Sequence, residues 1–221
     1  METSTSSPAS RETILNGYID SLTVEKQRAL LGEADSLLSR TKLYSYKPYP
    51  KQKEFHKAGA IHREILLMAS NQSGKSWAGA MEWAMHLTGR YPPWWEGKRF
   101  PKPVKLWASG ESAVFCRDNA QRLLVGPPER EEEWGTGAIP GDLIVGKPQR
   151  ARTVPNAIDS VVVRHITGKL SSLSFRTYDQ GREKWAGETI QGAWFDEEPP
   201  LDIYIEGLTR TNATDGFVII T

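Results

Sequence analysis

Short apolar runs alternate with longer helix-compatible segments along most of the chain. Runs rich in Val, Ile, Phe and Trp predict strands at residues 65–68, 104–108, 158–166, 173–178, 192–195 and 216–221. A helix is predicted from 76 to about 88, where Gly89, Pro92 and Pro93 bring it to an end, and another from about 111 to 124. Strands that alternate with helices predict an α/β fold, with a mostly parallel sheet flanked by helices.

The first 43 residues follow a different pattern. Residues 1–10 are rich in Ser and Thr and are predicted to be a disordered tail. Residues 11–43 are predicted to be a helical appendage of two helices, broken near 21–23. The second helix carries an apolar stripe that we expect to pack, formed by Leu30, Leu31, Ala34, Leu37 and Leu38. Residues 44–221 form the α/β domain, and because 216–221 is an apolar strand, we expect this domain to be truncated at its C-terminal end.

Composition narrows the class of protein. Of the 221 residues, 38% are hydrophobic and 25% charged, as in ordinary globular proteins. No stretch approaches the roughly 20 apolar residues that a membrane span needs, and the polar N-terminal segment lacks the apolar core of a signal peptide. The single cysteine, Cys116, permits no internal disulfide and fits a reducing compartment. A net charge of +1 means that any nucleic-acid contact must be local or supplied by parts outside this chain.

A turn of small residues follows the strand at 65–68 and precedes the helix from 76. Its residues are Ser70, Asn71, Gln72, Ser73, Gly74, Lys75 and Ser76. In a phosphate-binding loop (Walker A) of this plan, backbone N–H groups wrap a polyphosphate and the next helix points its positive end at it. Lys75 would reach the terminal phosphates, and Ser76 would ligate Mg²⁺. The strict pattern has Gly where this chain has Ala69, so the loop alone does not decide its function.

An acidic pair ends the strand at 192–195, as in a Walker B motif. Asp196 placed beside a phosphate loop meets the needs of a Mg²⁺ site, and Glu197 then lies where a general base polarises the attacking water. The alternative is a solvated turn after an edge strand, but the two motifs in this order favour the metal site. The adjacent Glu argues against GTPases and small-molecule kinases, and it indicates motor-type or helicase-type NTPases.

Several further motifs accompany this pair: YPKQKEF at 49–55, SNQSGKS at 70–76, YPPWWEG at 91–97, GTGAIP at 135–140, YDQGREKW at 178–185 and DEEP at 196–199. In combination they resemble the ATPase part of the large terminase subunit of tailed bacteriophages, over roughly residues 44–221. The resemblance implies a P-loop NTPase fold of the ASCE/RecA-like kind.

The same resemblance implies a function and partners. The expected activity is Mg²⁺-dependent hydrolysis of ATP that drives double-stranded viral DNA into a procapsid, in the cytoplasm of the host cell. Expected partners are the DNA, the portal protein, the small terminase subunit and further copies of the chain in a homo-oligomeric ring on the procapsid, with a monomer in isolation as the alternative. The family's C-terminal nuclease is expected to be absent from this chain, because the acids at 129–133 lie in a Gly/Pro-rich segment typical of a solvated loop.

The resemblance also assigns roles to residues outside the two motifs. Gln52 is expected to read the adenine edge, the alternative being an exposed helix glutamine. Tyr46 or Tyr49 would stack on the base or merely pack. Residues 218–221 resemble the start of the family's coupling strand, of which only the first Thr, Thr221, is present.

Some terminases carry an arginine inside the phosphate loop, at the position that Asn71 occupies here. This chain therefore needs an arginine from elsewhere. Arg182 is the preferred candidate, acting on the nucleotide of a neighbouring subunit, and Arg117 and Arg176 are the alternatives.

Two other functions fit the same motifs. A helicase-like or restriction-type DNA translocase shares the upstream Gln, the phosphate loop and the Asp-Glu pair, but needs a second RecA-like domain. A nucleotide-binding scaffold without turnover has no need of a water-activating carboxylate, so Glu197 argues against it.

Overall fold

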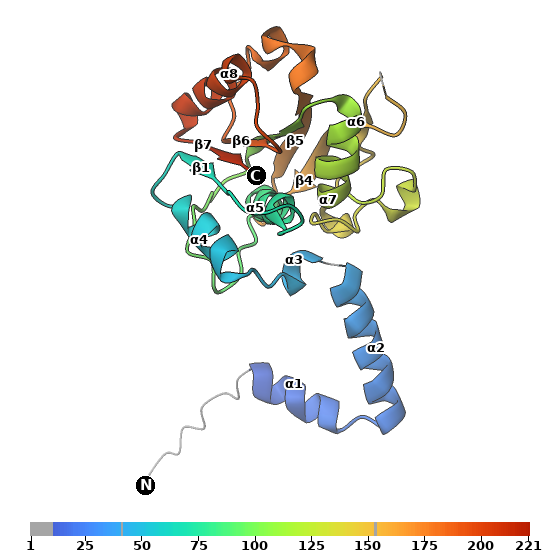
Figure 1. Cartoon of the computed structure of the whole chain (residues 1–221). Coiled ribbons are helices and arrows are strands. Elements are labelled where there is room, and N and C mark those ends of the chain that lie inside the picture. The colour runs from blue at the N-terminus through green and yellow to red at the C-terminus, as the bar shows by residue number, and fades with distance from the viewer. Residues whose placement is uncertain (1–10, 41, 153) are drawn as a thin grey trace. The chain divides into compact units, whose positions relative to one another are not determined.

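The computed structural model describes residues 11–40, 42–152 and 154–221, so the predicted disordered tail at 1–10 lies outside the described residues (Figure 1). The chain divides into two compact units, residues 1–39 and 40–221. The first holds helix α1 (Arg11–Asp20) and all but the last residue of helix α2 (Val24–Arg40), with the break where the sequence predicts it. Within this unit Leu30 and Leu31 of the apolar stripe are exposed, and the side chains of Leu37 and Leu38 lie outside the described residues.

The second unit is built on a single mixed sheet in the order β1-β7-β6-β2-β5-β4-β3. The first five strands in this order run parallel, and β4 and β3 continue the sheet in antiparallel fashion. The prediction of a mostly parallel sheet flanked by helices is therefore confirmed. The strands are β1 (Glu64–Leu66), β2 (Lys105–Gly110), β3 (Gln149–Arg150), β4 (Ile158–Arg164), β5 (Leu170–Thr177), β6 (Gly192–Phe195) and β7 (Phe217–Ile220).

Residues alternate between the two faces of the sheet, and each face is covered by its own helices (Figure 1). Leu106, Trp194 and Phe217 belong to the larger core, which α5 dominates, whereas Trp107 and Phe195 belong to a smaller core under α8. This alternation is what two-sided burial of a strand requires. The helices of this unit are α3 (Lys42–Ser45), α4 (Pro50–Ala58), α5 (Lys75–Thr88), α6 (Ala113–Cys116), α7 (Arg122–Leu124) and α8 (Leu201–Thr211).

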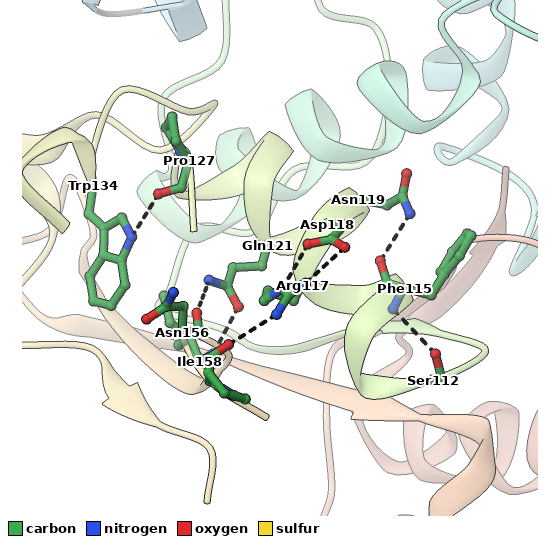
Figure 2. Close-up of polar contacts among 11 residues, drawn as sticks. Ser112, Phe115, Arg117, Asp118, Asn119, Gln121, Pro127, Trp134, Asn156 and Ile158 are labelled. Carbon is green, nitrogen blue, oxygen red and sulfur yellow. Dashed lines mark hydrogen bonds and ion pairs between the residues drawn. The ribbon is translucent and has the colours of Figure 1, made fainter. Parts of the chain in front are cut away.

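Two helical features differ from the prediction. Helix α8 was missed because its β-branched Ile203, Ile205 and Thr209 favour strands, while burial of Ile203 against the sheet stabilises the helix instead. The helix expected at about 111–124 forms, but α6 and α7 are joined by a π-helical turn, Arg117–Gln121. The Gln121 side chain holds this turn to the neighbouring loop (Figure 2), since its amide donates to the Asn156 carbonyl at 2.9 Å and accepts from the Ile158 N–H at 2.8 Å.

Strand order decides where functional residues can meet. The carboxyl ends of β1, β7, β6, β2 and β5 share one edge because these strands are parallel. Strand β7 lies between the strand before the phosphate loop and the strand before Asp196, with Ile219 opposite both Ile65 and Trp194. A loop or turn that follows any of these strands therefore opens at this edge, where α/β proteins bind their ligands. No helix among the described residues is long and apolar enough to cross a membrane.

Candidate nucleotide-binding site

The loop between β1 and α5 is shaped to receive an anion. Gln72 and Gly74 have φ values of 60° and 80°, in the left-handed region that turns the backbone sharply into the helix. Among the described residues, no acceptor is found for the backbone N–H groups of residues 70–76, and the hydroxyl of Ser73 is buried without a partner. Unpaired donors at the positive end of a 14-residue helix are what a phosphate group satisfies.

Lys75 lies at the first position of α5, and its ammonium currently binds the loop itself. Its Nζ donates to the carbonyl oxygens of Ala69, at 3.0 Å, and Ser70, at 3.4 Å. The long side chain thus spans the concave side of the loop, where terminal phosphates would replace the two carbonyls as its partners. Ala69 stands where the strict motif has Gly, and its backbone carbonyl accepts the hydrogen bond from Lys75.

Asp196 follows β6 and is 2% exposed. Its Oδ1 accepts a hydrogen bond from the Thr221 hydroxyl at 2.9 Å. Burial raises the pKa of Asp196, and the nearby hydroxyls of Ser76 and Thr221 oppose that rise. A buried carboxylate beside the serine of a phosphate loop fits a divalent cation, because the added positive charge compensates the burial.

Glu197 differs from its neighbour because its side chain is exposed. Its backbone is held at φ 70°, which is uncommon for a residue with a side chain and typical of a constrained functional turn. Three hydrogen bonds fix this turn. The Glu197 N–H donates to the Thr221 carbonyl at 3.1 Å, and the Tyr178 hydroxyl donates to the carbonyls of Asp196, at 3.2 Å, and Glu197, at 3.0 Å.

The side chain of Glu197 borders two hollows at this edge of the sheet. One hollow, of about 690 Å³, is also lined by Lys75 and Thr221. The other, of about 520 Å³, is also lined by Tyr178 and Glu111. The predicted base therefore faces the space in front of the phosphate loop. Among the described residues, no group of three His, Cys, Asp or Glu is arranged to hold a metal, so a cation here would rely on Asp196, Ser76 and the phosphates.

Gln52 lies on the other side of the loop and is buried, so the alternative of an exposed helix glutamine is wrong. Its amide NH₂ donates to the Gly74 carbonyl at 2.9 Å, and its Oε1 accepts from the Tyr49 N–H at 2.9 Å. Together with Tyr46 and Trp77, these residues line a cavity of about 630 Å³ next to the loop. The cavity offers room for a nucleoside, while the amide already has partners for both of its polar atoms.

The three candidate arginines are each bound to other groups of the chain. Arg117 pairs with Asp118 (Figure 2). It also donates to the Pro155 carbonyl at 3.1 Å. Arg176 lies over the Trp107 ring, 5.2 Å from its centroid. Arg182 has an exposed side chain, and its Nε donates to Glu206 of α8 at 2.9 Å. The structure thus brings together Lys75, Ser76, Asp196, Glu197 and Thr221.

Sequence reasoning missed one contributor to the site. The sequence places Tyr178 only in a strand and a motif, yet its hydroxyl fixes the backbone of the acidic pair. Its position immediately after β5 was the available signal, because residues that follow parallel strands meet at one edge. The contact of Thr221 with Asp196 could not be read from sequence, since it depends on β7 pairing beside β6.

A parallel sheet with a phosphate loop after one strand and a buried Asp after another defines a P-loop NTPase of the ASCE/RecA-like kind. Within that class, residues 66–221 match the family described as terminase large subunit, T4likevirus-type, N-terminal. The chain belongs to the terminase large subunit family.

Individual relatives agree with this assignment. The large terminase subunit of Salmonella phage P22 is 41% identical over 94% of this chain, and that of Enterobacteria phage LP7 is 25% identical over 94%. These alignments cover 45% and 47% of the two relatives, so the chain spans about half of their length. The large terminase of a thermophilic bacteriophage, solved in complex with ADP, shares the fold with a TM-score of 0.52 and 16% identity, over 78% of this chain and 38% of that one.

Proposed function

We propose that this chain is the ATPase part of a DNA-packaging motor and that it hydrolyses ATP with the help of Mg²⁺. The observation that carries the proposal is the juxtaposition of Asp196, Ser76 and Thr221 beside a phosphate loop for whose N–H groups the described residues offer no partner. Mere nucleotide storage does not require the exposed Glu197 on a constrained turn in front of that loop. The site therefore supports turnover better than a scaffold role.

Each residue then has a defined task. The loop N–H groups and Lys75 hold the phosphates, and Ser76 and Asp196 would hold the cation, which neutralises charge on the phosphates when bound. Glu197 accepts a proton from the attacking water as a general base. Thr221 contacts Asp196 through its hydroxyl and Glu197 through its carbonyl, so strand β7 is placed to respond to changes at the phosphates.

The role in packaging rests on the family. Large terminase subunits of P22 and LP7 are its relatives, and the thermophilic phage's large terminase was solved with ADP. We extend to this chain, in the host cytoplasm, the expected partners: double-stranded viral DNA, a portal protein, a small terminase subunit and further copies of itself in a ring. The family match favours this role over a helicase-like or restriction-type translocase.

Substitution of Lys75 tests the assignment of the phosphate loop. We expect Lys75→Ala to lower ATP turnover at least about 100-fold and to weaken nucleotide binding, because it removes the mobile positive charge facing the terminal phosphates. Phosphate release by the purified chain, with calorimetric titration of ATP, measures both. Lys102→Ala, on an exposed loop, is the matched control and should leave both values unchanged. Equal turnover by the wild-type chain and Lys75→Ala would remove this assignment.

A further inference from the structure

A chain of polar side chains crosses the interior behind the phosphate loop. Glu82 lies on α5, the helix that begins at the loop, and its side chain is fully buried, as are those of His56 and His86. His56 Nδ1 is 2.8 Å from Glu82 Oε2, and His86 Nε2 is 3.5 Å from Glu82 Oε1. His56 Nε2 is in turn 3.1 Å from the Tyr46 hydroxyl.

Complete burial of ionisable side chains lowers the stability of a protein unless the side chains pair with one another through hydrogen bonds or opposite charges. Burial by itself raises the pKa of Glu82, but the hydrogen bond with His56 and the proximity of both imidazole rings outweigh it, so the pKa lies below its usual value. Burial lowers the pKa of His86. Glu82 is therefore an acceptor toward His56 Nδ1, which must donate, and this fixes both side chains.

The Tyr46 hydroxyl connects the buried His56 to Gln52, which contacts the phosphate loop. It lies between His56 Nε2 and Gln52 Oε1, from which it is 3.5 Å away. Its ring packs edge-on against His56 and Trp94, so its position depends on the interior as a whole. Because the hydroxyl contacts both His56 and Gln52, it links the position of the glutamine to that of the imidazole.

Gln52 completes the connection to the site. Its NH₂ group donates to the carbonyl of Gly74, the residue at which the loop becomes α5. A Cβ added to Gly74 would lie 3.0 Å from Gln52 Nε2, so glutamine and loop are closely packed. Movement of Gln52 would therefore remove one of the two donors to this carbonyl at the left-handed turn of Gly74, the other being the Ala78 N–H at 3.0 Å.

We propose that Glu82, His56 and Tyr46 are positioning residues for the phosphate loop, acting through Gln52. In this arrangement Gln52 braces the loop from behind, in addition to any contact with a base. The proposal rests on the proposed nucleotide site. It predicts that damage to the buried chain weakens binding of every phosphate ligand alike, whereas loss of base recognition would affect only the preference for adenine.

The test measures binding to the 221-residue chain by calorimetric titration with ADP, GDP and inorganic pyrophosphate. Tyr46→Phe removes one hydroxyl and keeps the ring. We expect about fivefold to tenfold weaker binding of all three ligands, the range that one hydrogen bond gives. His56→Asn, whose amide keeps a donor toward Glu82 but loses the contact with Tyr46, should have the same effect. Tyr44→Phe, an exposed tyrosine that contacts Arg90, is the matched control and should bind as the wild type.

A double-mutant cycle shows whether Tyr46 acts through Gln52. Gln52→Ala and the double variant Tyr46→Phe/Gln52→Ala should bind pyrophosphate equally, because the brace is already lost in the single variant. Independent, multiplying losses would overturn the proposal, as would wild-type affinity in folded Tyr46→Phe and His56→Asn. If the wild-type chain itself binds none of the ligands, the proposed nucleotide site fails, and this inference fails with it.

Discussion

At the scale of one residue, the buried carboxylate of Asp196 serves the site but lowers the stability of the folded chain at neutral pH. Its folded-state pKa lies above the usual value because the carboxyl is buried. The folded chain therefore favours the neutral form of the carboxyl group. This preference stabilises the fold below pH 3.8, the usual pKa of the group, and the stabilisation is lost as the pH rises through the higher pKa of the folded state. At neutral pH the ionised group is a net cost to stability when no cation compensates it.

Replacement of this carboxylate should therefore stabilise the chain. Asp196→Asn keeps an oxygen that can accept from Thr221 and removes the buried charge. We expect a rise of about 2–4 °C in the unfolding midpoint at pH 7 in a chelating buffer, the shift that about 1 kcal/mol gives at this chain length, together with loss of Mg²⁺-dependent turnover. Thermal denaturation followed by circular dichroism measures the first effect. A lower midpoint would mean that the carboxylate's hydrogen bonds outweigh its burial.

Glu197 should separate nucleotide binding from chemistry. Glu197→Gln keeps the shape of the side chain but removes its ability to accept a proton, which typically lowers the rate by about 10²–10⁴-fold. ATP affinity should stay near the wild-type value because Asp196 and the loop are untouched. Single-turnover hydrolysis and calorimetric binding give the two quantities. If Glu197→Gln abolishes Mg²⁺ dependence and Asp196→Asn spares it, the two roles are exchanged.

At the scale of elements, helix α5 and strand β6 are held together by one close approach. A Cβ on Gly79 of α5 would lie 2.7 Å from the fully buried Trp194 ring of β6, whose Nε1 donates to the Thr221 hydroxyl at 2.8 Å. The absence of a side chain at Gly79 thus lets the helix of the phosphate loop approach the strand of Asp196. Packing at this point sets the spacing between the two halves of the site.

Insertion of a single methyl group should reveal this contact. We expect Gly79→Ala to lower the free energy of unfolding by about 1–3 kcal/mol, as overpacking of a core does. Urea denaturation of the whole chain, followed through the unfolding transition of the second unit, measures this change. Gly32→Ala makes the same change in α2, where a Cβ meets nothing within 4 Å, and should leave that transition unchanged. Equal stability of wild type and Gly79→Ala would show that Trp194 yields without cost.

The elements differ in how far sequence could predict them. Strands such as 192–195 and helix α5 were predictable because apolar runs and the stop at Gly89 are local signals. Helix α8 was not, because its propensity opposes the packing that stabilises it. The same limit applies to the site. Lys75, Ser76 and Asp196 follow from motifs, whereas the bonds of Tyr178 and Gln52 depend on strand order and on burial between distant segments.

At the scale of the whole molecule, the site lacks an assigned arginine. Within the same chain, Arg117 binds Asp118, Arg176 binds Glu188 and Arg182 binds Glu206. Arg182 has the most exposed side chain of the three, and its partner Glu206 also binds Arg210. Release of Arg182 would therefore leave Glu206 paired, which suits a group that changes partners on assembly.

Mixing two inactive variants tests whether Arg182 serves a neighbouring subunit. Arg182→Ala and Glu197→Gln should each be poor ATPases in assembled particles, since an arginine supplied by a neighbour is worth roughly 10³–10⁵-fold in turnover. A mixture should regain part of the activity, because some interfaces join an intact Glu197 to an intact Arg182. Phosphate release at several mixing ratios measures the gain. Without complementation by folded, assembling variants, Arg117, Arg176 or an arrangement within one subunit becomes the better assignment.

The position of β7 also governs the order in which the protein can be made. Among the described strands, β1 pairs with β7, which follows it by about 150 residues and separates it from β6. On the ribosome the phosphate loop therefore emerges long before its strand has a neighbour in the sheet. Contacts between residues so far apart in sequence form slowly, because a long loop must close first. A nascent chain halted before Phe217 would carry every residue of the loop and still lack the nucleotide site.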